Sequence, residues 1–139
     1  MNLEDYVVSL QLYNKTDKIY FCNTPMYHYL SRKGSLSKSG FFAKKMSVLE
    51  TSENIRKYFV DEEATKDIIS GVDHFVFRMY ASIFWEIYKY KPQDWKALIR
   101  KWEEKSLQVF RRFVKNADKQ KGDWKRVIQF FLVLLSARL

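Results

Sequence analysis

The side chains that could take part in a reaction lie within the first 37 residues of the 139-residue chain. Glu4 and Asp5 form an acidic pair, and a carboxylate within hydrogen-bond reach can accept a proton from an attacking hydroxyl. Farther along, the segment MYHYLSRKGSLS, residues 26–37, combines histidine, arginine, glycine and serine. Arginine can hold phosphate oxygens through two nitrogens, and hydroxyl and backbone donors of a glycine-containing loop can satisfy the rest. Side chains of these types are able to take part in proton transfer and phosphate binding.

The acidic pair has a structural interpretation as well. Carboxylates in a first helical turn complement the helix dipole, and Val8 and Leu12 lie one turn apart, so the sequence predicts a helix that begins at Glu4 or Asp5. Residues 14–17, NKTD, should end it. Taken alone, the pair is explained by this helix start, because acidic residues at such positions are abundant.

The next segment favours extended backbone. Residues 18–22, KIYFC, are rich in β-branched and aromatic side chains and predict a short strand, which the turn before Pro25 interrupts. Residues 26–31 continue it, so one strand or a hairpin is expected. In that segment His28 is open to a structural role beside its neighbours or to a chemical one. Residues 34–40 hold two glycines and three serines and predict a loop, which we take as the boundary of the first segment.

From Phe41 onward the apolar residues recur at three and four positions, which predicts helices. Pro92 should break the helical run and Gly122 should separate the last helix. The predicted helices are Phe41 to about Phe59, with Thr51 or Ser52 as the N-cap of a second segment; about Glu62 to Lys89; Asp94 to about Asn116; and Asp123 to the end. The expected fold class is mainly α, a helical bundle with one short N-terminal β-strand or hairpin.

The order of the N-terminal motifs carries a resemblance. An ED pair that opens a helix, the strand KIYFCNTP and the loop MYHYLSRKGSLS follow one another, and this order resembles the end of the catalytic domain of GT-A type family 2 glycosyltransferases of bacterial polysaccharide biosynthesis. The resemblance covers residues 4 to about 50, and a variable helical tail follows in that family. It divides the chain into residues 1–40, the end of the catalytic domain, and residues 41–139, a C-terminal helical domain.

The resemblance implies a role for five residues. Asp5 would be the general base that takes a proton from the acceptor hydroxyl, with Glu4 beside it. His28, Arg32 and Ser35 match the loop that closes over the diphosphate of the nucleotide-sugar donor. The implied reaction transfers a sugar from that donor to a surface polysaccharide or glycan acceptor.

The motifs that hold the donor in that family are not found in this sequence. The metal-binding DxD motif and the uridine-binding strand precede the ED motif, and the chain has no DxD elsewhere. We therefore expect a C-terminal portion that is inactive alone, with no cofactor of its own. The full-length enzyme would use a divalent metal, Mg or Mn.

The net charge of +9 is confined to the second part of the chain. Residues 1–88 carry eleven basic and eleven acidic side chains, whereas residues 89–139 carry fourteen basic and five acidic ones. This asymmetry indicates an anionic partner, a membrane surface or an acidic protein, or else a solvated lysine-rich face. The alternative function is a stand-alone basic interaction module, and a homo-oligomer is open. Nucleic acid is not expected, because carboxylates interleave with the basic residues and no nucleic-acid-binding motif accompanies them.

The chain is expected in the cytoplasm, peripheral on the inner face of the membrane at most. Cys22 is the only cysteine, which fits a reducing compartment. The sequence MNLEDYVV does not resemble a signal peptide, and no uncharged apolar run approaches the ~18 residues that a spanning helix needs. The hexapeptide FFLVLL, residues 130–135, lies beside Lys125, Arg126 and Arg138. It fits either a buried core helix, which we favour for so short a run, or a helix that meets a membrane or a partner.

Overall fold

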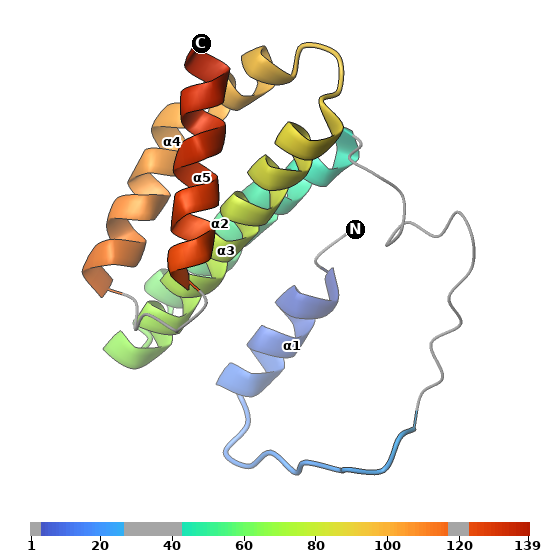
Figure 1. The fold of residues 1–139 in the computed structure, drawn as a ribbon. Helices are drawn as coiled ribbons and strands as arrows, with labels where there is room; N and C mark the ends of the chain where they lie inside the picture. The colour runs from blue at the N-terminus through green and yellow to red at the C-terminus, as the bar shows by residue number, and fades with distance from the viewer. Residues whose placement is uncertain (1–3, 27–42, 117–122) are drawn as a thin grey trace.

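The structure is a computed structural model that describes residues 4–26, 43–116 and 123–139. The described chain is helical throughout its regular parts, and the prediction of a mainly helical bundle is confirmed (Figure 1). The elements are α1 (Glu4–Asn14), the short 3-10 helix η1 (Ala43–Met46), α2 (Ser47–Asp61), α3 (Lys66–Tyr90), α4 (Trp95–Asn116) and α5 (Asp123–Arg138).

Helix α3 is the centre of the bundle, since α2, α4 and α5 all pack against it and α4 also packs on α5. A helix contacted by three others must be apolar over more than one stripe, and α3 meets this requirement. Its buried apolar side chains are Val72, Val76, Phe77, Tyr80, Ala81, Ile83, Phe84 and Ile87. The partner helices contribute single stripes, among them Leu49, Ile55 and Phe59 from α2; Ile99, Val109 and Phe113 from α4; and Phe130, Val133 and Leu134 from α5.

The break between α3 and α4 falls where Pro92 predicts it. Lys91 ends α3 in the left-handed region with φ 43°, and its N–H donates to the carbonyl of Ile87 at 2.8 Å. Pro92 cannot continue the helix because it has no N–H, and Asp94 accepts the N–H of Leu98 through its carbonyl at 3.0 Å as α4 begins. The predicted bounds of the last three helices are confirmed to within a few residues.

The predicted N-cap at Thr51 or Ser52 is wrong, because α2 runs through both positions without interruption. Ser52 is fully buried, and its hydroxyl donates to the carbonyl of Leu49 at 2.8 Å, one turn earlier in the same helix. A buried serine can satisfy its hydroxyl in this way without ending a helix. Residue type alone did not separate the two arrangements.

The predicted strand is not formed in the described part of the chain. Residues 18–22 are irregular backbone with exposed side chains. A strand is stable only when a neighbour pairs with its N–H and C=O groups, and no described segment lies beside this one in a β-ladder. Residues 27–31, the expected continuation, lie outside the described residues.

Helix α1 lies against the bundle through few side chains, on the side away from α4 (Figure 1). Val7 and Leu10 contact the core cluster, whereas Val8 and Leu12 are 54% and 58% exposed. Clefts of about 170 Å³ and about 290 Å³, lined in part by Leu10, remain between α1 and helices α2 and α3. Open clefts on either side of Leu10 show that α1 covers this part of the bundle incompletely.

Candidate functional site

Two of the five predicted site residues, Glu4 and Asp5, lie in the described part of the chain. The backbone of Glu4 and Asp5 is helical and belongs to α1, and because Glu4 is the first of the described residues the predicted helix start stays a prediction. His28, Arg32 and Ser35 lie outside the described residues. Their relation to Asp5 stays a prediction.

The segment after α1 exposes large apolar side chains. The helix ends where the hydroxyl of Thr16 donates to the carbonyl of Leu12 at 2.5 Å. Beyond it Ile19 is 66%, Phe21 90% and Met26 79% exposed. Consecutive apolar side chains in water are unfavourable unless another surface covers them, so this segment is a candidate contact surface.

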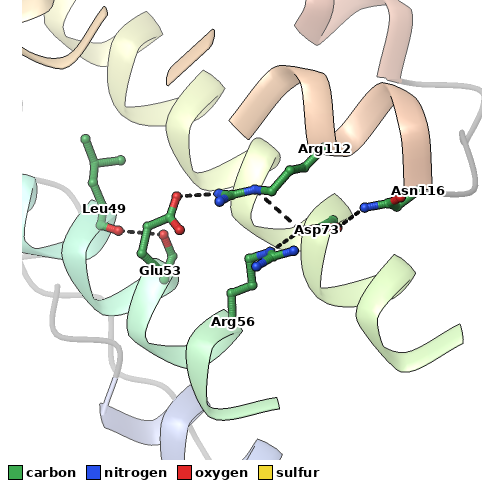
Figure 2. Close-up of polar contacts among 7 residues, drawn as sticks. Leu49, Glu53, Arg56, Asp73, Arg112 and Asn116 are labelled. Carbon is green, nitrogen blue, oxygen red and sulfur yellow. Dashed lines mark hydrogen bonds and ion pairs between the residues drawn. The ribbon is translucent and has the colours of Figure 1, made fainter. Parts of the chain in front are cut away.

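The bundle contains a buried charge cluster that the sequence analysis missed (Figure 2). Asp73 of α3 has a side chain that is 0% exposed, and its Oδ1 accepts from Nε of Arg56 on α2 at 2.6 Å. Its Oδ2 accepts from Nδ2 of Asn116 at the end of α4 at 2.8 Å. Arg112 of α4 donates through Nη2 to Oε1 of Glu53 at 2.6 Å, and its Nε lies 3.8 Å from Oδ1 of Asp73.

This cluster joins α2, α3 and α4 and balances two guanidinium groups against two carboxylates. Such an arrangement is stable only while each charge keeps its partners, because an unpaired buried charge is strongly unfavourable. The hydrogen bonds of the cluster join residues that are 17, 43 and 59 positions apart in the chain, so their spacing gave no signal. One sign was available: Asp73 and His74 interrupt the apolar run GVDHFVF, residues 71–77. We assign the cluster a structural role.

Tyr80 lies in the core near this cluster. Its side chain is fully buried, and its hydroxyl has no hydrogen-bond partner among the described residues. Burial, followed by the carboxylate of Glu53, raises the pKa of the Tyr80 hydroxyl well above its ordinary value of 10.0. The Arg112 guanidinium opposes this effect and Glu50 adds to it.

Tyr80→Phe should therefore leave stability at neutral pH unchanged or slightly higher, because the lost hydroxyl makes no hydrogen bond in the described part of the chain. At alkaline pH the two proteins should differ. Above pH 10 the unfolded wild type releases the Tyr80 proton while the folded state retains it, so stability falls by up to about 1.4 kcal/mol per pH unit from this group. Urea unfolding between pH 8 and 11 checks this, and parallel stability curves for the two proteins would contradict it.

A second polar contact fixes the start of α5. Nε2 of His74 on α3 lies 2.9 Å from Oδ2 and 3.0 Å from Oδ1 of Asp123, the first residue of α5. The His74 ring stacks on Phe113 of α4 at a centroid distance of 5.9 Å. This contact sets which side of α5 faces the core.

The outer side of α5 is apolar and uncovered in the described structure. Its exposed side chains, named here the α5 face, are Trp124 (66%), Ile128 (59%), Leu132 (52%), Leu135 (56%) and Leu139 (95%). The prediction that FFLVLL is buried is therefore only partly right: Phe130, Val133 and Leu134 are in the core, but Leu132 and Leu135 point outward. A hexapeptide in a helix spans all sides, and in the described part of the chain the helices that pack on α5, α3 and α4, cover only one side of it.

The α5 face continues into an apolar cleft between α4 and α5. This cleft has a volume of about 290 Å³ and is lined by Phe110, Phe113, Val114, Asp123, Trp124 and Val127. Three exposed basic residues adjoin these lining residues in the sequence, Lys125 on α5 and Arg111 and Lys115 on α4. Apolar surface flanked by cations is the second candidate binding feature of the chain.

The search for a metal centre finds no group of three or more His, Cys, Asp or Glu side chains in ligating arrangement among the described residues. None of the described helices has the length and apolarity needed to cross a membrane. Comparison of the chain with protein-family models, with curated proteins and with solved structures finds no match.

Proposed function

We propose that the chain is the C-terminal portion of a family 2 glycosyltransferase that transfers a sugar from a nucleotide-sugar donor to a surface polysaccharide or glycan acceptor. The order of the ED pair, the segment KIYFCNTP and the loop MYHYLSRKGSLS supports this proposal. The helical backbone of Glu4 and Asp5 in α1 is compatible with it, since the acidic pair lies in a helix in that family.

The observation that carries the proposal is the uncovered segment after α1. Ile19, Phe21 and Met26 are exposed, and α1 itself is loosely packed on the bundle. A segment from the edge of a β-sheet exposes its backbone groups and apolar side chains when the rest of the sheet is not beside it. The segment after α1 would be exposed for this reason. The donor-binding domain would supply that sheet from outside these 139 residues.

In the proposed reaction, Asp5 accepts the proton of the acceptor hydroxyl as its oxygen attacks the anomeric carbon. The bond from that carbon to the diphosphate breaks, and the nucleoside diphosphate leaves. Arg32, with Ser35 and His28, would hold the diphosphate oxygens. A divalent metal on the DxD motif of the donor-binding domain would neutralise charge on the leaving group.

The test is turnover by the native gene product that contains these residues, measured as nucleotide release from a panel of nucleotide sugars with Mg or Mn. Asp5→Asn should lower kcat by about 10²- to 10⁴-fold and leave donor binding nearly intact, because a lost proton acceptor raises the barrier more than it changes the ground state. Arg32→Ala should weaken donor binding. The isolated 139-residue chain should give no turnover.

Asp17→Asn is the matched control, since Asp17 is an exposed carboxylate just beyond α1. Its rate should equal that of the wild type. Wild-type rates in both Asp5→Asn and Arg32→Ala would remove the two residues from the mechanism, and turnover by the isolated chain would show that it is catalytically complete.

A stand-alone basic interaction module is the second candidate, and the α5 face favours it. An uncovered apolar stripe beside basic side chains is a contact surface whether or not the chain takes part in sugar transfer. If the native gene encodes no donor-binding domain and Asp5→Asn is without effect, this second function replaces the first.

A further inference from the structure

We propose that the α5 face docks on an anionic lipid surface, with α5 lying in the plane of the headgroups and the basic side chains of α4 and α5 on the lipid phosphates. This inference is independent of sugar transfer, because it rests on the opposite end of the chain from the predicted catalytic residues.

The geometry of α5 is that of an interfacial helix. The α5 face follows spacings of four, four, three and four residues from Trp124 to Leu139, so it lies along one side of the helix over about 22 Å. The opposite side is held in the core by Phe130, Val133 and Leu134. The helix therefore cannot turn its apolar face inward without unpacking the bundle.

The contacts at the two ends of α5 fix this orientation. His74 holds Asp123 at the first turn, and Nε of Arg100 on α4 donates to the carbonyl of Ala137 at 2.8 Å in the last turn. A face presented outward by contacts at both ends is available for binding without rearrangement.

The charge of helices α4 and α5 indicates what kind of partner binds to the α5 face. Helices α4 and α5 together carry ten basic and three acidic side chains. The acidic side chain of α5, Asp123, is buried against His74, and Glu103 of α4 is paired with Arg138. Arg138 is therefore balanced by Glu103, as Arg112 is by Glu53, but α4 and α5 still carry an excess of basic side chains, which favours an anionic surface.

A second copy of the chain is the less favourable occupant. Lys125 lies at one end of the α5 face and Arg138 at the other. Antiparallel pairing of two α5 helices brings Lys125 near Arg138 of the second copy, and parallel pairing brings Lys125 near Lys125. Parallel pairing therefore opposes like charges, and antiparallel pairing offers Lys125 only an arginine that Glu103 already pairs, whereas lipid phosphates would meet Lys125 with opposite charge.

The side chains themselves fit a lipid interface better than an acidic protein. The exposed residues of the α5 face are aliphatic apart from Trp124, and a tryptophan at one end of such a stripe is suited to the headgroup level. Lys125, Arg111 and Lys115 have long stems that keep their charges at the phosphates while the aliphatic side chains enter the acyl region. The cleft beside Trp124 extends the apolar surface available to an acyl chain.

The experiment is flotation of the 139-residue chain with vesicles of phosphatidylcholine alone and of phosphatidylcholine mixed with phosphatidylglycerol. Binding is expected to the mixed vesicles, with a blue shift of tryptophan fluorescence that Trp124→Phe removes. Binding should weaken in about 1 M salt, where screening acts within about 3 Å. Ile128→Ser with Leu132→Ser should lower the affinity at least about tenfold.

Val8→Ser with Leu12→Ser is the matched control, because these α1 residues have similar exposure, 54% and 58%, far along the chain from α5. It should bind vesicles like the wild type, and circular dichroism should show that both double variants are folded. No binding to the mixed vesicles, or an equal loss in both variants, would overturn the proposal. So would sedimentation that shows a dimer which only the Ile128 and Leu132 substitutions dissociate, since the occupant would then be a second copy.

Discussion

Replacing Asp73 with leucine should lower the free energy of unfolding by about 3 kcal/mol or more. The substitution removes the carboxylate that Arg56 and Asn116 contact at 2.6 Å and 2.8 Å, and it leaves the Arg56 guanidinium without its partner. Loss of one member of a buried ion pair typically costs 3–5 kcal/mol. We expect the lower end because the Arg56 and Arg112 side chains are 21% and 28% exposed and can regain part of their hydration. Urea unfolding at neutral pH measures the loss.

Asp61→Ala provides the control for this prediction. Asp61 is an exposed carboxylate at the last residue of α2, where the helix dipole disfavours it, so its removal should change stability by at most about 0.5 kcal/mol. If Asp73→Leu left the free energy of unfolding nearly unchanged, the attractions within the cluster would only offset the cost of burying its charges. Its role in holding α2, α3 and α4 together would then be refuted.

The sequence predicted the helices whose limits are set locally. Pro92 fixes the end of α3, and the apolar repeat from Val72 to Ile87 fixes its length and its buried side. In each case the cause lies within a few residues of the effect. The strand over residues 18–22 failed for the opposite reason, because β-structure depends on a partner that local sequence does not provide.

The buried charge cluster and the α5 face show the same limit. Asp73 meets Arg56 and Asn116 at separations of 17 and 43 residues, so only the packed bundle brings them together. The α5 face could not be predicted because the segment FFLVLL is apolar on all sides of the helix. Which of its side chains are buried depends on the helices that pack against α5. The predicted chemistry of Asp5 and Arg32 came from motif order, and it stays a prediction.

The aromatic centre of the bundle gives the second large effect. Phe77 is fully buried on α3, and its ring lies 4.2 Å from that of Phe113, 5.6 Å from that of Phe130 and 5.8 Å from that of Phe110, measured between centroids. Phe77→Ala should lower the free energy of unfolding by about 3–5 kcal/mol, because a cavity forms where three helices meet. Urea unfolding monitored by circular dichroism measures it.

Leu135→Ala is the control for this substitution, since Leu135 is 56% exposed on the α5 face and should change stability by about 0.5 kcal/mol or less. A double-mutant cycle between Phe77 and Phe113 adds a sharper test. Their rings are stacked with an interplanar angle of 18°. In this cycle Phe77→Leu and Phe113→Leu should show a coupling free energy of about 0.5–1.5 kcal/mol. Additive losses, or a loss for Phe77→Ala no larger than that for Leu135→Ala, would mean that α3 and α4 are not packed through these rings.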